Sequence, residues 1–96
     1  MAKKITREEE GKLPSFDNHR DAINWFKYKY IHDFRWFGTD TVGDEICHFC
    51  AIILDRKAFE TGRGMLLQGN AVAGTDYLNS FQVIEIFQSG RIHIVH

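Results

Sequence analysis

The chain has little of several features that mark specialised classes of protein. Its 96 residues include only two cysteines, too few for the disulfide framework of a small secreted domain. No run approaches the roughly 18 to 20 apolar residues that cross a bilayer, and residues 1–10 lack the apolar core of a signal peptide. Neither export nor membrane insertion is expected, so the sequence predicts a cytoplasmic protein.

The charge balance lacks an excess of either sign. Lys and Arg number 12 against 13 Asp and Glu, for a formal net charge of −1. Non-specific nucleic-acid binding needs a basic surface that neutralises phosphates. The balance therefore argues against bulk nucleic-acid binding.

Motifs for common enzyme classes are also missing. The sequence contains no G-x-S-x-G, Walker loop, H-E-x-x-H or G-x-G-x-x-G. Residues 62–64, Gly-Arg-Gly, lack the preceding strand and the spacing of a phosphate loop. We therefore expect neither enzymatic activity nor a cofactor.

Aromatic residues, in contrast, are abundant: eight Phe, three Tyr and two Trp. A chain of this size buries roughly 60 to 70% of the surface that its unfolded form exposes. One small core has difficulty enclosing so many rings. Some of them are expected to line a pocket or an interface.

The expected elements follow the order α-β-β-α-β-β. Residues 1–12 are read as a flexible charged tail and residues 13–96 as a single α+β domain. Hydrophobic periodicity and turn residues place helices at 15–30 and 56–68, and strands at 34–37, 45–54, 77–88 and 91–95. The predicted fold class is α+β, an antiparallel sheet of about four strands with two helices packed on one face.

Local signals refine the first helix. Ser15 or Asp17 is expected to cap it. Its core-facing residues recur at helical spacing: Ala22, Ile23, Phe26 and Tyr30.

The last two strands are expected to form a tight hairpin around the two-residue turn Ser89-Gly90. That register places Phe87 opposite Ile92 and Glu85 opposite Ile94, with apolar groups on both faces. It also brings Glu85 diagonally near His96, close enough for an ion pair or an acid–base couple.

Cys47 and Cys50 form a Cys-x-x-Cys pair, a pattern that can ligate zinc or cycle as a dithiol. Residues three apart in a strand point to opposite faces. The two sulfurs are therefore expected to diverge, as buried and inert thiols with no metal site.

Aromatic and basic residues interleave along Trp25–Tyr30 and Phe34–Phe37. Aromatic faces can stack on bases, while Arg and Lys bind phosphates. Helical spacing assigns Phe26 and Tyr30 to the core. The candidate residues for binding a ligand or partner are Trp25, Tyr28, Arg35, Trp36, Arg63 and Arg91.

Three segments, Phe16–Phe26, Ile53–Phe59 and Ile84–His96, resemble small uncharacterised proteins of Gram-positive bacteria and their phages. The resemblance spans most of residues 13–96. It implies an accessory role, such as inhibiting a host or defence protein or sequestering a signalling nucleotide, and it transfers no site residues.

The leading hypothesis is a non-enzymatic binding module, a homo-oligomer that inhibits a protein partner through an aromatic surface. The alternative is capture of a small ligand, a nucleotide, by Trp25 or Trp36 with one of the candidate arginines. A third hypothesis is a zinc- or thiol-dependent activity at Cys47 and Cys50.

Overall fold

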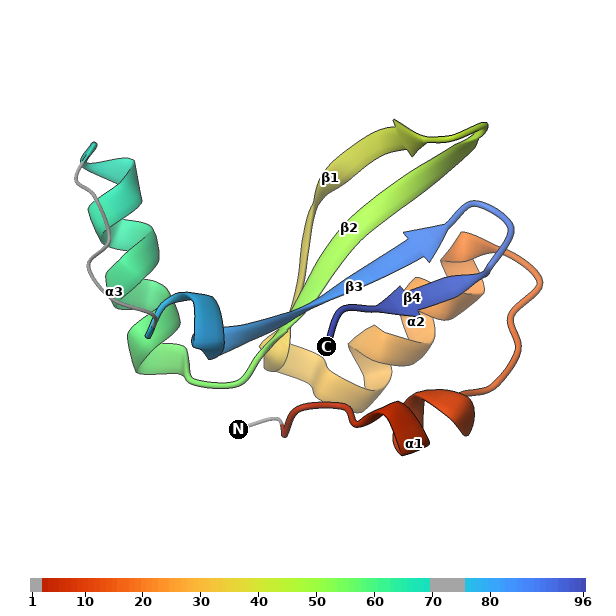
Figure 1. Cartoon of the computed structure of the whole chain (residues 1–96), viewed down its shortest axis with the longest axis horizontal. Helices are drawn as coiled ribbons and strands as arrows, with labels where there is room; N and C mark the ends of the chain where they lie inside the picture. The colour runs from red at the N-terminus through yellow and green to blue at the C-terminus, as the bar shows by residue number, and fades with distance from the viewer. Residues whose placement is uncertain (1–2, 70–75) are drawn as a thin grey trace.

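The computed structural model describes residues 3–69 and 76–96. Its four strands form one antiparallel sheet in the order β1-β2-β3-β4 (Figure 1). The strands are β1 (Phe34–Val42), β2 (Glu45–Ile53), β3 (Phe81–Phe87) and β4 (Ile92–Ile94), and the main helices are α2 (His19–Tyr30) and α3 (Arg56–Leu67). The predicted α+β class and the order α-β-β-α-β-β of the main elements are confirmed.

Three short helical segments complete the described chain: α1 (Arg7–Gly11) and the 3-10 turns Ile31–Asp33 and Leu78–Ser80. Within the described ranges, no helix combines the length and the apolar content that crossing a bilayer requires.

Helix α2 starts later than expected. Its cap is Asn18, whose side-chain oxygen accepts from the Asp21 N–H at 2.9 Å, and neither Ser15 nor Asp17 fills that role. Residues 15–18 remain outside the helix because they run along the β3–β4 hairpin, where the His19 N–H donates to the Gln88 carbonyl. A tertiary contact thus sets the start of the helix.

The core lies between α2 and one face of the sheet. Ala22 and Phe26, both expected on the buried face of the helix, are fully buried. The sheet supplies alternate residues to this layer, among them Phe34, Cys50, Ile52, Ile84, Ile86 and Ile94. Burying one such aliphatic side chain contributes about 1.5 to 3 kcal/mol, so each isoleucine of this layer stabilises the fold by about that amount.

The β3–β4 hairpin differs from the predicted register by one residue. Ile84 pairs with Ile94 and Glu85 with His93. The loop has three residues, Gln88 to Gly90, because Gly90 adopts a left-handed conformation (φ +94°) and the Phe87 N–H bonds to the Arg91 carbonyl. The shift places the isoleucines of both strands on the core face, while the buried Phe87 and the half-buried Val83 lie on the other face. The hairpin therefore carries apolar groups on both faces, as expected, although the register differs.

Strand β1 is longer than the predicted residues 34–37. The segment expected as a connection, residues 38–44, continues the strand to Val42, and only the tip around Gly43 (φ +65°) turns. The pairing shifts between Trp36 and Gly38, where Gly38 has φ +140°. A bulge built on this glycine lets the strand continue through a sequence rich in turn-forming residues.

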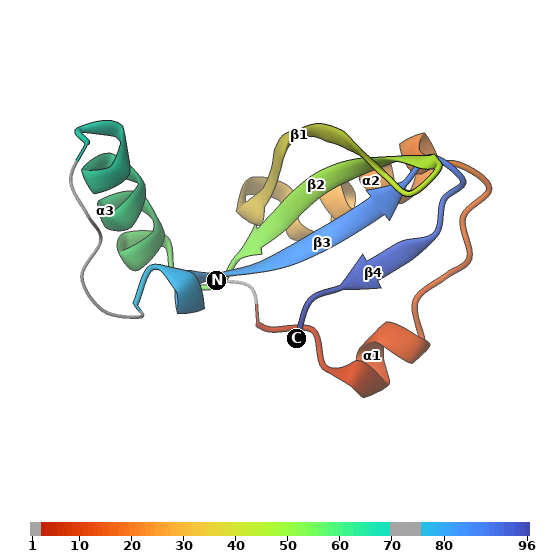
Figure 2. The same ribbon diagram turned by 45° about the horizontal axis from the view of Figure 1, so that its top comes forward.

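Helix α3 begins after Asp55, whose carboxylate accepts from the Ala58 N–H at 3.1 Å, as expected. Its position differs from the prediction, since it lies beyond the end of the sheet and not beside α2 on one face (Figure 2). Phe59 is fully buried there, with its ring 5.8 to 6.3 Å from those of Phe37, Tyr77 and Phe81. These rings form a second, smaller cluster. Most of the loop expected at 69–76 lies outside the described residues.

The N-terminal segment is packed against the sheet, which departs from the expected flexible tail of residues 1–12. Ile5 is only 3% exposed, and its backbone exchanges two hydrogen bonds with the Gln82 amide, at 2.7 and 3.0 Å. Glu10 accepts from the Ile94 N–H at 3.0 Å. The segment therefore lies beside the β4 edge (Figure 2). Burial of Ile5 and these hydrogen bonds hold it there, although most of its residues are charged.

Candidate ligand-binding groove

One open groove of about 420 Å³ lies between α2 and the outer half of the sheet, and we call it the His19–Trp36 groove. Arg20, Asn24 and Lys27 recur at helical spacing and share one face of α2. The sheet contributes Trp36 from β1 and His48 from β2. The complete lining is His19, Arg20, Ile23, Asn24, Lys27, Trp36 and His48.

Two histidines stack at one end of the groove. The rings of His19 and His48 are parallel within 7°, and their centroids are 4.4 Å apart. The His19 N–H donates to the Gln88 carbonyl at 3.2 Å, and the Gln88 N–H donates to the Ile46 carbonyl at 2.9 Å. The hairpin loop therefore ties the first residue of α2 to β2, two residues before His48.

Trp36 orients His48. Its indole N–H donates to Nδ1 of His48 at 3.3 Å. A ring nitrogen that accepts carries no hydrogen, so the hydrogen of His48 lies on Nε2. Nε2 of His48 and Nδ1 of His19 are both buried and have no hydrogen-bond partner among the described residues. Unpaired buried polar atoms are rare and costly, so their presence at one site points to a role in binding.

The groove favours negative charge. Arg20 and Lys27 are exposed cations, and none of the residues that line the groove is acidic. His19 is the first residue of a 12-residue helix, whose N-terminus adds partial positive charge. An anion entering here meets two cations and no opposing carboxylate.

Only one of the six predicted binding residues lies in this groove. Trp36 is 54% exposed and forms part of the lining. Trp25 instead packs edge-on against Phe16 and Phe26, beneath the ammonium group of Lys29. Tyr28 is 88% exposed on α2 and lies outside the groove.

The three predicted arginines are dispersed. Arg35 donates to the His32 and Phe34 carbonyls beside its own strand. Arg63 lies on α3. Arg91 lies over the Phe87 ring, 3.9 Å from its centroid. The structure therefore does not bring these arginines together with Trp36.

Sequence reasoning missed most of the groove. Its binding candidates did not include Arg20, Asn24, Lys27, His19 or His48, all of which line the groove. One sequence signal could have revealed the groove. Arg20, Asn24 and Lys27 are spaced at i, i+4 and i+7, so they form a polar stripe on α2 beside its apolar stripe. No sequence signal pairs His19 with His48, because register and packing decide that contact.

The cysteines are buried and free. The pKa of the Cys50 thiol is raised to about 12, mainly by burial, with Cys47 acting in the same direction and Lys27 against it. Burial also raises the pKa of Cys47, with Glu85 acting in the same direction. No cluster of three or more His, Cys, Asp or Glu residues in the described chain could hold a metal ion. Thiol chemistry and zinc binding therefore find no support at this pair.

The predicted Glu85–His96 proximity was wrong, since the one-residue register shift changes the partners. Glu85 pairs with His93 at 2.5 Å across the hairpin. His96 pairs instead with Glu10 at 2.7 Å, and this bond lowers the pKa of the Glu10 carboxyl.

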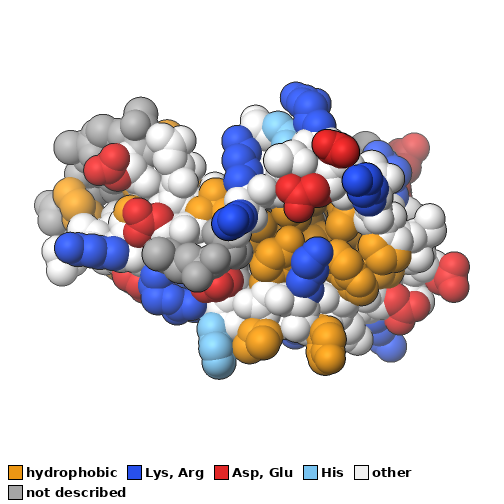
Figure 3. Space-filling model, turned by 90° about the horizontal axis from the view of Figure 1, so that it is seen from below, with side chains coloured by type: hydrophobic (Ala, Val, Ile, Leu, Met, Phe, Trp, Pro, Cys, Tyr) orange, Lys and Arg blue, Asp and Glu red, His pale blue; other side chains and the backbone are white. Residues whose placement is uncertain are grey.

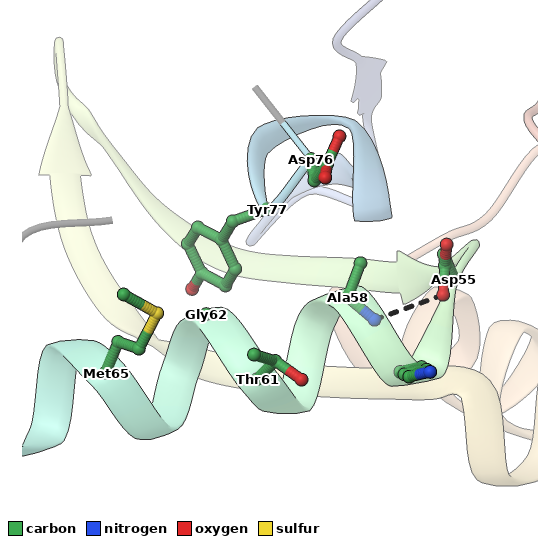
Figure 4. Close-up of a pocket in the computed structure, with 8 residues that line it drawn as sticks. Asp55, Ala58, Thr61, Gly62, Met65, Asp76 and Tyr77 are labelled. Carbon is green, nitrogen blue, oxygen red and sulfur yellow. Dashed lines mark hydrogen bonds between the residues drawn. The ribbon is translucent and has the colours of Figure 1, made fainter. Parts of the chain in front are cut away.

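A second hollow, of about 350 Å³, adjoins α3 (Figure 4). Asp55 is occupied as the helix cap, and the Tyr77 ring lies against Gly62 in the middle of the helix. The Asp55 carboxylate is thus used as a helix cap, and the Tyr77 ring fills the space beside Gly62.

Comparison with protein-family models, curated proteins and solved structures finds no match to this chain. The function is therefore inferred from the geometry and charge of the His19–Trp36 groove.

Proposed function

We propose that this protein is a non-enzymatic binding module that captures a small anionic ligand in the His19–Trp36 groove. The observation that carries the proposal is the composition of the groove: Arg20 and Lys27 on one helix face, two imidazoles with unpaired buried nitrogens, and no carboxylate. An anion would accept charge-assisted hydrogen bonds from the exposed side chains of Arg20 and Lys27.

Binding, and not catalysis, is what this arrangement supports. A general base or nucleophile must lie within hydrogen-bond reach of its partner in an accessible site. Cys50 is fully buried among core side chains with its thiol pKa near 12, and the Glu85–His93 pair lies on the opposite face of the sheet.

The test is a titration of the ¹⁵N-labelled protein with pyrophosphate, followed by amide chemical shifts. We expect the largest shifts at the start of α2 and around His48. Arg20→Gln and Lys27→Gln should each weaken binding about fivefold, since a charge-assisted contact is worth roughly 1 kcal/mol or more. Arg63→Gln removes the same charge from α3, outside the groove, and should leave the affinity unchanged. Equal losses in all three variants, or no site-specific shifts, would refute the proposal.

A protein partner is the second candidate function, and the exposure of β1 favours it. Trp36 and Phe37 are adjacent, 54% and 51% exposed, on an edge strand of the sheet. An uncovered edge with exposed rings suits pairing with another chain, including a second copy. The α2 side of the molecule also carries a continuous hydrophobic area (Figure 3). Sedimentation of the wild type and of Phe37→Ser tests self-association: a monomer at high concentration excludes the homo-oligomer.

A further inference from the structure

We infer that the anionic ligand of the groove carries a flat ring that stacks on Trp36, which makes a nucleoside monophosphate its chemical class. The inference rests on the proposed function. That function places the anionic group of the ligand at Arg20 and Lys27, and the inference identifies the ring attached to that group. It is carried by the position and the fixed orientation of Trp36 in a groove otherwise suited to an anion.

The orientation of Trp36 leaves its face for a ligand. Its only polar atom already donates to His48 at 3.3 Å. The contact holds the indole in place, so little side-chain entropy remains to be lost when a ligand stacks on it. With 54% of the residue exposed, the ring presents an apolar surface toward the groove. A fixed, half-exposed indole beside cations is the combination that recognises a base attached to a phosphate.

The dimensions and polar groups of the groove fit one nucleotide. Its volume of about 420 Å³ falls in the usual range of small-molecule sites, about 300 to 1,000 Å³. Arg20 and Lys27 are seven residues apart on α2, which spans about 10 Å along the helix axis. Asn24 lies between them and offers both a donor and an acceptor.

A single nucleotide fits better than a nucleic-acid strand. Strand binding needs a basic track that continues beyond one site. The chain has a net charge of −1, and the cations outside the groove are dispersed, with Arg91 paired to Glu45 and Arg63 on α3.

The experiment compares ligands that differ only in the base. Ribose 5-phosphate, AMP, GMP, CMP and UMP are titrated into the ¹⁵N-labelled protein, and the two indole N–H signals are followed with the amides. At least one nucleotide should bind about 5- to 150-fold more tightly than ribose 5-phosphate, the equivalent of one stacked base. The Trp36 indole signal should shift with nucleotides and not with ribose 5-phosphate.

Two variants separate stacking from other effects. Trp36→Leu should abolish the difference in affinity between nucleotides and ribose 5-phosphate, and Trp36→Phe should retain most of that difference. Nucleotides that bind no better than ribose 5-phosphate would overturn this inference and leave anion capture standing. If neither pyrophosphate nor ribose 5-phosphate binds, the proposed function itself fails. A (dT)₈ strand that binds more tightly than every mononucleotide would also overturn the inference.

Discussion

Gly90 faces the carbonyl group of Phe16 so closely that a β-carbon on the glycine would lie 2.3 Å from the Phe16 oxygen. The same hypothetical carbon would lie 2.9 Å from the backbone nitrogen of Asn18, the cap of α2. The β3–β4 loop and the start of α2 therefore meet backbone to backbone. This contact sets the position of His19 and, through it, one end of the groove.

Gly90→Ala should lower the free energy of unfolding by about 2 to 4 kcal/mol, because overpacking against rigid backbone adds to the cost of a left-handed residue. Chemical denaturation measures the loss. Any folded fraction should also bind pyrophosphate more weakly, since the displaced helix start moves His19. A variant as stable as the wild type would contradict the close contact.

The two glycines of α3 make a matched pair. A β-carbon at Gly62 would lie 2.3 Å from Cδ1 of Tyr77, whereas nothing lies within 4 Å of one at Gly64. Gly62→Ala should therefore destabilise the protein by about 1 to 3 kcal/mol, and Gly64→Ala should stabilise it by about 0.5 to 1 kcal/mol through helix propensity. Thermal unfolding of both variants is the measurement, and equal shifts of the same sign would disprove the packing of Tyr77 on α3.

Glu10 links stability to pH. The hydrogen bond with His96 lowers its pKa below 4.5 in the folded state, so its contribution is present above that value and is lost as the pH falls through the folded pKa. Glu10→Gln should reduce stability by at most about 1 kcal/mol near neutral pH and should flatten the decline in stability as the pH falls below 4.5. Glu8→Gln is the control, because Glu8 pairs with Lys12 and both side chains are largely exposed. Identical pH profiles for the two variants would argue against the docked N-terminal segment.

The thiols should resist modification in the folded protein. With a pKa near 12 for Cys50, about one thiol in ten thousand is ionised at pH 8, and the thiolate is the reactive form. Ellman's reagent should therefore label neither cysteine natively and both in denaturant. Rapid native labelling of either residue would revive the hypothesis of a thiol-dependent function.

Much of the fold could be predicted from local sequence because it depends on local signals. The apolar stripe with Ala22 and Phe26 predicted α2, and hydrophobic periodicity and turn residues predicted α3 and β2. The errors fell where a distant contact decides, as at Asn18, which caps α2 beside the hairpin. At Gly38, likewise, the composition predicted a turn, whereas the structure has a bulge and the strand continues.

The groove was harder to predict than the fold. Trp36 was a candidate because an exposed ring on a strand is visible in composition and spacing. Its partners were not, because His19 and His48 are 29 positions apart and meet only through the packing of α2 on β2.

The sequence by itself determined the two main helices and the order of helices and strands, since periodicity and caps act within a few residues. The tertiary structure alone decided the hairpin register, the docking of the N-terminal segment and the stacking of His19 on His48. Those features depend on backbone contacts between segments far apart in the chain, which no local pattern encodes.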